Sequence, residues 1–309
     1  MPKIQQHQSH THMLNHLSKP QPRIDLAELA AQIRFERVTI IGNAPGAWQP
    51  AALGATFIFN GTQYQQAQAN LERAQTHASQ LFNIANGGFA DSQYAFVVHG
   101  HEQGPLLARA LTQVATELTP LLGCWPSSGL TTIALMVRLA NTVTVQRMSL
   151  LPSLQRPEEL AIARPLPCMV HNWLGERRLA KALFSHRLAW DEFTLLPVEV
   201  QTSHTIGNDN PFLLLDILRQ NPVDAKPSLQ VRQEQLNALV ALSQTPTSTW
   251  LHYAQETDLS DYESLFFNHM PEIKPSYWFL MDYEASQYLD SIRHQLAYCQ
   301  QVADSVLFP

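Results

Sequence analysis

Apolar, β-branched segments that end in small or amide residues constrain the fold of this chain more than any other feature. The candidate strands span residues 37–41, 56–59, 80–85 and 94–98. The first three run into GNAPG, NG and NGG turns, and helical patterns over 64–80 and 105–122 lie between the segments. This alternation predicts an α/β fold with a doubly wound, mostly parallel sheet. Ligands bind at the carboxyl ends of such strands, so the turns fall where a ligand is expected.

The rest of the chain predicts a tail, one α/β domain and a helical extension. Residues 1–23 are polar and rich in Gln and His, which is typical of a disordered tail that binds metal only weakly. The α/β domain is predicted over 24–190, because a helical pattern over 131–139 and a strand pattern over 141–145 continue the alternation. Residues 191–309 carry mainly helical patterns and are predicted to form an acceptor site, a lid or a docking region.

The composition favours a cytoplasmic protein that does not bind nucleic acid. Its formal net charge is -6, whereas a protein that binds phosphate backbones broadly needs a basic face. Only three cysteines are present, so we expect no disulfide framework and a reducing compartment. Neither a secretory signal nor a membrane-spanning segment is expected. Charged residues make up only 15%, which leaves a peripheral membrane or partner contact open.

Two glycine-containing turns are candidate ligand contacts. In IIGNAPG, Gly42 lets backbone N–H groups face an anion, and Asn43 adds an amide side chain. In WPSSGL, Ser127 or Ser128 can cap the following helix, and Gly129 permits close approach to its positive end. Neither GxGxxG, nor a P-loop, nor a GxSxG elbow is present. An ordinary turn and a plain capped helix are the structural alternatives.

His171 and Glu176 form an H-x4-E pattern where a helical run begins. A neutral histidine with a pKa of about 6.5 takes up a proton at neutral pH, as a general base must. Residues five apart do not share one helix face, so the pair does not predict a metal site. A histidine with a purely structural role is the alternative.

In this order, the three elements resemble the sialyltransferases over residues 36–184. Bacterial members carry a strand followed by GNGPS, an ITSG-like element before a helix, and a later catalytic histidine. Animal members carry P-S/T-x-G and H-x4-E. The resemblance implies a Rossmann-like variant of the sheet and inverting transfer of sialic acid from CMP-sialic acid to a glycan acceptor, with no cofactor and no obligatory metal.

The resemblance also implies donor contacts at the strand ends. Asn43 and Asn60 match asparagines that contact the donor nucleotide and its sugar, and Asn86 matches a further donor contact. Gly42 and Ala44 lie in the matching turn, where Ala44 replaces a glycine.

At the helix start and beyond, the resemblance implies both binding and catalysis. Ser127, Ser128 and Gly129 match the T-S-G core that faces the donor. His171 matches the general base, and Glu176 matches the acidic residue of the animal motif.

The phosphate-binding tyrosines of the family are not found in the proline-containing stretch over 149–168. Arg147, Arg156 or Arg164 would then supply the positive charge, because arginine suits phosphate oxygens. Solvated surface is the alternative for all three.

Other functions stay open on the same scaffold. One is a transferase that uses another nucleotide-linked donor or transfers pyrophosphate, in which His171 is incidental. Another is a non-catalytic, sialyltransferase-like domain that only binds. A nicotinamide-dependent reductase is disfavoured by the missing GxGxxG.

Overall fold

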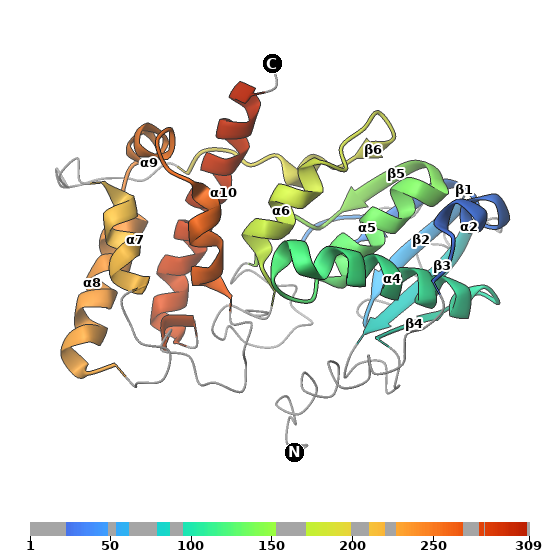
Figure 1. Ribbon diagram of the computed structural model, residues 1–309, viewed down its shortest axis with the longest axis horizontal. Helices are drawn as coiled ribbons and strands as arrows, with labels where there is room; N and C mark the ends of the chain where they lie inside the picture. Colours follow the sequence, from blue (N-terminus) through green and yellow to red (C-terminus); the bar gives the residue numbers. More distant parts are fainter. Residues whose placement is uncertain are drawn as a thin grey trace. The chain divides into compact units, whose positions relative to one another are not determined.

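The computed structural model describes residues 23–48, 54–61, 79–86, 95–152, 171–198, 210–219, 227–267, 278–280 and 282–307 (Figure 1). These residues divide into two units. The first takes the described residues of Met1–Leu121, Trp125–Met148 and Ala182–Asp191, and the second takes those of Leu122–Cys124, Ser149–Lys181 and Glu192–Pro309. Residues 1–22 of the predicted tail and residues 64–78 of the helix predicted over 64–80 lie outside the described residues.

One mixed, mostly parallel sheet forms the centre of the first unit. Its strands are β1 (Phe35–Ile41), β2 (Gly54–Phe59), β3 (Ser79–Asn86), β4 (Phe96–His99), β5 (Ala140–Gln146) and β6 (Leu188–Ala189). Their order is β4-β3-β2-β1-β5-β6, and β4 pairs antiparallel with β3 while the other pairs are parallel. An α/β fold with a mostly parallel sheet is therefore confirmed.

Apolar side chains explain why these segments form central strands. In β2, residues 55–59 are all buried, which fits a strand covered on both faces. The rings of Phe57 and Phe82 stack with centroids 4.6 Å apart across the β2–β3 register, and Phe35 meets both rings edge-on. Aromatic contacts of this kind stabilise a core beyond the area they bury.

Three of the described helices belong to the first unit: α2 (Leu26–Gln32), α4 (Gly104–Leu122, whose last residue belongs to the second unit) and α5 (Ser128–Leu139). The Asp25 carboxylate accepts hydrogen bonds from the N–H groups of Ala27 and Glu28 and so caps α2. α5 leads directly into β5, so it runs against the parallel strands and begins at their carboxyl edge.

The strand order reverses at β1, and this reversal positions the candidate site. β2 and β3 lie on one side of β1, whereas β5 and β6 lie on the other. In α/β sheets, ligands bind outside the carboxyl ends of the strands at such a reversal. The segments that follow β1 and β5 occupy this position.

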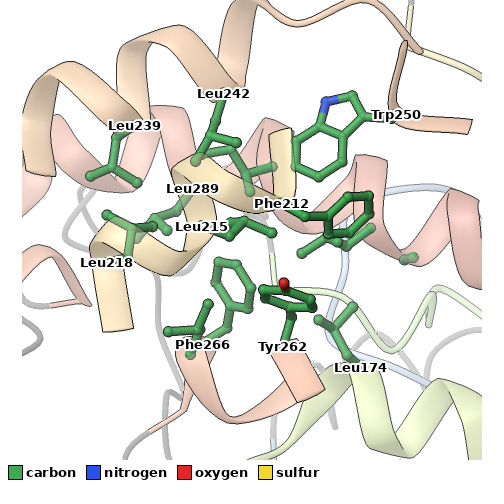
Figure 2. Packing of buried hydrophobic residues seen from close by; sticks show 14 of the residues in the cluster. Leu174, Phe212, Leu215, Leu218, Leu239, Leu242, Trp250, Tyr262, Phe266 and Leu289 are labelled. Atoms are coloured by element: carbon green, nitrogen blue, oxygen red, sulfur yellow. The ribbon is translucent and has the colours of Figure 1, made fainter. Parts of the chain in front are cut away.

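The second unit is helical. It contains α6 (Trp173–Lys181), α7 (Pro211–Arg219), α8 (Leu229–Gln244), α9 (Thr247–Ala254), α10 (Tyr283–Leu307) and the 3-10 helices η4 (Leu259–Phe266) and η5 (Trp278–Leu280). Figure 2 shows the side chains of Phe212, Leu242, Trp250 and Tyr262 in its core, where the Phe212 and Trp250 rings meet edge-on with centroids 5.6 Å apart. A mainly helical C-terminal region is thus confirmed. Among the described helices, none is both long and apolar enough to cross a membrane.

The sequence suggested one boundary between the domains near residue 190. In the structure the chain instead passes between the two units at several positions. The described part of Ser149–Lys181, which contains α6, groups with the helical unit. Leu174 of α6 is buried in the helical core, and the guanidinium of Arg178 binds the Glu263 carboxylate at 2.8 Å. These contacts explain why α6 belongs to the second unit.

Candidate functional site

The turn after β1 is held by the end of β5. The Gly42 N–H donates to the Gln146 carbonyl at 2.8 Å, and the Ala44 N–H donates to the Arg147 carbonyl at 3.2 Å. A Cβ atom on Gly42 would lie 2.1 Å from the Arg147 carbonyl oxygen, so only glycine fits. Asn43 and Ala44 are exposed on this turn. Gly42 therefore permits close packing of the chain, and residues 43–46 are the exposed part of the turn.

Arg147 follows β5 directly and is buried, with 5% of its surface exposed. Its Nε–H donates to the Ala44 carbonyl. The alternative that Arg147 is solvated surface is therefore wrong. Arg156 and Arg164, the other two candidates for the phosphate charge, lie outside the described residues.

A chain of hydrogen bonds joins the ends of β2 and β3 to the start of α5. Asn60 takes a left-handed φ of 56°, and its side-chain oxygen accepts the Asn86 N–H at 3.2 Å. The Asn86 side-chain amide then donates to the Ser128 hydroxyl at 2.5 Å. Three residues that the sequence assigned to the donor site thus lie together at the carboxyl edge of the sheet.

The start of α5 is capped and closely packed. The Ser127 hydroxyl accepts the Leu130 N–H at 3.2 Å, which identifies Ser127 as the N-cap. A Cβ atom on Gly129 would lie 2.7 Å from the Met148 Sδ, so Gly129 also meets a packed side chain. Both serines are almost completely buried. The positive end of a twelve-residue helix therefore lies at the edge formed by the strand ends.

His171 and Glu176 belong to the second unit, in and beside the first turn of α6. His171 is half-buried, and its ring meets the Trp173 ring edge-on with centroids 5.2 Å apart. Glu176 is completely buried. The sequence placed both residues in the α/β domain, whereas the contacts of α6 place it in the helical unit.

Asn172 caps α6, a structural role that the sequence analysis missed. Its side-chain oxygen accepts the Gly175 N–H at 2.9 Å and caps α6, and its amide donates to the Leu122 carbonyl and the Glu263 carboxylate. An asparagine directly before a helical pattern is a capping signal that could have revealed this role.

Cys124 lies beside this cap. Its sulfur accepts the Asn172 backbone N–H at 3.3 Å. Burial, with a smaller contribution from the nearby charge of Glu176, raises the pKa of the Cys124 thiol to about 11. A thiol with so high a pKa is a poor nucleophile near neutral pH, since the thiolate is the reactive form.

The described residues show what the first unit offers a ligand. Side-chain amides, a serine hydroxyl and a helix N-terminus at one sheet edge suit a phosphate and sugar hydroxyls. Within the described ranges, no group of three or more His, Cys, Asp or Glu side chains is arranged to hold a metal ion. Comparisons with models of protein families, with curated proteins and with solved structures found no match to this chain.

Proposed function

We propose that the carboxyl edge of the first unit binds a nucleotide-sugar donor, and that the protein is an inverting glycosyltransferase that uses CMP-sialic acid and a glycan acceptor. The scaffold is then a Rossmann-like variant of the kind implied by the sialyltransferase resemblance. Gly42, Asn43, Ala44, Asn60, Asn86, Ser127, Ser128 and Gly129 form or support the donor site.

The observation that carries this proposal is the hydrogen-bonded chain from Asn60 through Asn86 to Ser128. It links two strand ends to the N-terminus of α5, next to the strand-order reversal where α/β proteins bind ligands. The alternation of strands and turns predicted this grouping from the sequence. Such an arrangement fixes polar groups before a ligand arrives, which lowers the entropy cost of binding.

His171 is the proposed general base. In an inverting transfer, the base removes the proton of the acceptor hydroxyl while that oxygen attacks the anomeric carbon and the CMP phosphate leaves. Because a phosphate is already a good leaving group, the protein mainly has to orient it and stabilise its charge. The positive end of α5 is suited to this task.

Donor binding is tested by thermal unfolding with CMP, CDP, UDP, GDP, ADP, NAD and S-adenosylmethionine. A ligand at 100 times its Kd adds about 2.7 kcal/mol to the free energy of unfolding, so we expect CMP to raise the Tm by several degrees. Asn86→Ala should weaken the CMP response. Asn141→Ala, which removes an amide near the amino end of β5, is the matched control and should keep it.

Turnover is tested by the release of CMP from CMP-sialic acid in the presence of glycan acceptors. We expect His171→Ala to lose transfer and to keep CMP binding, whereas the exposed His252→Ala should keep both. Unchanged transfer by His171→Ala would remove His171 from the mechanism.

A second candidate is a domain that binds a nucleotide without transferring sugar. Ser127 caps α5 and Glu176 is buried in α6, so two of the proposed site residues already have structural roles. CMP binding without CMP release for any acceptor would favour this candidate. A Tm increase with a different nucleotide would favour a transferase with another donor.

A further inference from the structure

Arg147 has an unusual backbone conformation for an arginine. Its φ is 56°, and the other non-glycine residues with positive φ in the described ranges are Asn60 and Leu150. Asparagine adopts this region at modest cost, whereas arginine gains nothing from its side chain there. Residues held in such conformations cluster at ligand-binding sites.

The side chain of Arg147 is held on the turn after β1. Its Nε–H donates to the Ala44 carbonyl, while its own carbonyl accepts the Ala44 N–H at 3.2 Å. A Cβ atom on Gly46 would lie 4.0 Å from the Arg147 Cγ. Arg147 therefore fixes the turn over residues 43–46 through both its backbone and its side chain.

The next residue, Met148, connects this turn to the start of α5. A Cβ atom added to Gly42 would lie 2.8 Å from the Met148 Cβ, and one added to Gly129 would lie 2.7 Å from the Met148 Sδ. The turn after β1, the end of β5 and the first turn of α5 thus converge on two consecutive residues. A fixed guanidinium charge and the positive end of a helix lie at the same edge of the sheet.

We infer that Arg147 positions the donor phosphate: it fixes the turn that carries the backbone N–H groups of Asn43 and Gly46, and it provides a buried positive charge that favours the nucleotide phosphate over the uncharged nucleoside. This inference rests on the proposed nucleotide site and specifies its ligand as a nucleoside monophosphate or a nucleotide sugar.

The test compares the Kd of CMP with the Kd of cytidine by calorimetry for the full chain and its variants. Arg147→Gln removes the charge, and we expect its preference for CMP over cytidine to fall about tenfold or more, as for the loss of a charge-assisted contact. Arg147→Lys keeps the charge and loses the Nε–H contact, so it should bind both ligands more weakly and retain the preference. Arg138→Gln, at an exposed arginine near the end of α5, is the matched control and should retain both affinities.

Arg147→Gly provides a second uncharged variant, because glycine adopts a φ of 56° without strain. It should lose the preference as Arg147→Gln does, even if the glutamine variant folds poorly. An unchanged preference for CMP over cytidine in the folded uncharged variants would overturn the inference and leave Arg147 with a purely structural role.

Failure of the proposed donor has a different signature. If wild-type protein binds UDP or ADP and not CMP, the sialyl donor is wrong, and the same comparison is made between that nucleotide and its nucleoside. If neither a nucleotide nor inorganic pyrophosphate binds wild-type protein, both the proposed site and the role of Arg147 are overturned.

Discussion

Two arginines of the helical unit are buried, and their guanidinium groups are satisfied to different degrees. Arg177 donates to the carbonyls of Ser149 and Phe193 and lies 4.1 Å from the centroid of the Phe193 ring. Arg293 donates to the Phe266 carbonyl at 2.6 Å, but its Nε and Nη1 atoms are buried without a hydrogen-bond partner among the described residues. Burial lowers the pKa of each guanidinium to about 10, so both remain charged at neutral pH.

This difference predicts unequal effects of removing the two charges. Arg177→Met leaves two carbonyls without their donor and should lower the free energy of unfolding by about 2–4 kcal/mol. Arg293→Met loses one hydrogen bond but also removes two unsatisfied donors, so we expect a change within about 1 kcal/mol. Urea unfolding measures both values. A larger loss for Arg293→Met than for Arg177→Met would contradict the assignment.

At the scale of elements, the glycines that follow β1 and begin α5 differ in what they contact. A side chain at Gly42 would meet the Arg147 carbonyl, which is backbone and cannot move aside. At Gly129 it would meet the end of the flexible Met148 side chain. Gly129 also lies in the first turn of α5, where alanine favours the helix by about 1 kcal/mol over glycine.

We therefore expect Gly42→Ala to lower the free energy of unfolding by more than about 2 kcal/mol and Gly129→Ala to change it by less than about 1 kcal/mol. Adding Met148→Ala should relieve the contact at Gly129, giving favourable coupling in the double variant. The same addition should not rescue Gly42→Ala, because the obstacle there is the Arg147 backbone. Equal costs for the two glycine substitutions would contradict this description of the turn.

Local patterns predicted the elements that carry the donor site. The segments 37–41, 56–59 and 80–85 fall within β1, β2 and β3, and the Ser127 cap defines the start of α5. Periodicity and capping signals are local, so one sequence is enough to detect them. The Asn60 side chain and the Asn86 backbone N–H meet because parallel strands end at the same edge of the sheet.

Features that depend on distant contacts could not be predicted in this way. The antiparallel direction of β4 is set by its pairing with β3, and the sequence pattern of a strand is the same in either direction. The assignment of α6 to the helical unit depends on Glu263, which lies 85 residues beyond Arg178. The burial of Arg147 depends on the turn that contains Ala44.

At the scale of the whole molecule, buried thiols link stability to alkaline pH. Burial raises the pKa of Cys299 to about 12 and that of Cys124 to about 11, from an ordinary value of 9.0. Above pH 9 the unfolded chain therefore releases thiol protons that the folded chain still holds. By proton linkage, the stability contributed by each thiol is complete below pH 9 and is lost as the pH rises toward the folded pKa.

We expect the free energy of unfolding to fall between pH 9 and 11, by at most about 1.4 kcal/mol per pH unit for the fully buried Cys299 thiol. Cys299→Ala should flatten this slope. The effect of Cys124→Ala should be smaller, because Cys124 is half-buried and better solvated. Urea unfolding at several pH values gives the slopes, and identical slopes for wild type and Cys299→Ala would contradict the linkage.

Nucleotide binding at the carboxyl edge of the sheet in the first unit can be tested by backbone hydrogen exchange followed by mass spectrometry, with and without saturating CMP. We expect slower exchange in residues 42–47 and 128–130 and unchanged exchange in α7 and α8 of the second unit. Unchanged exchange in both first-unit segments, or protection confined to the helical unit, would contradict it.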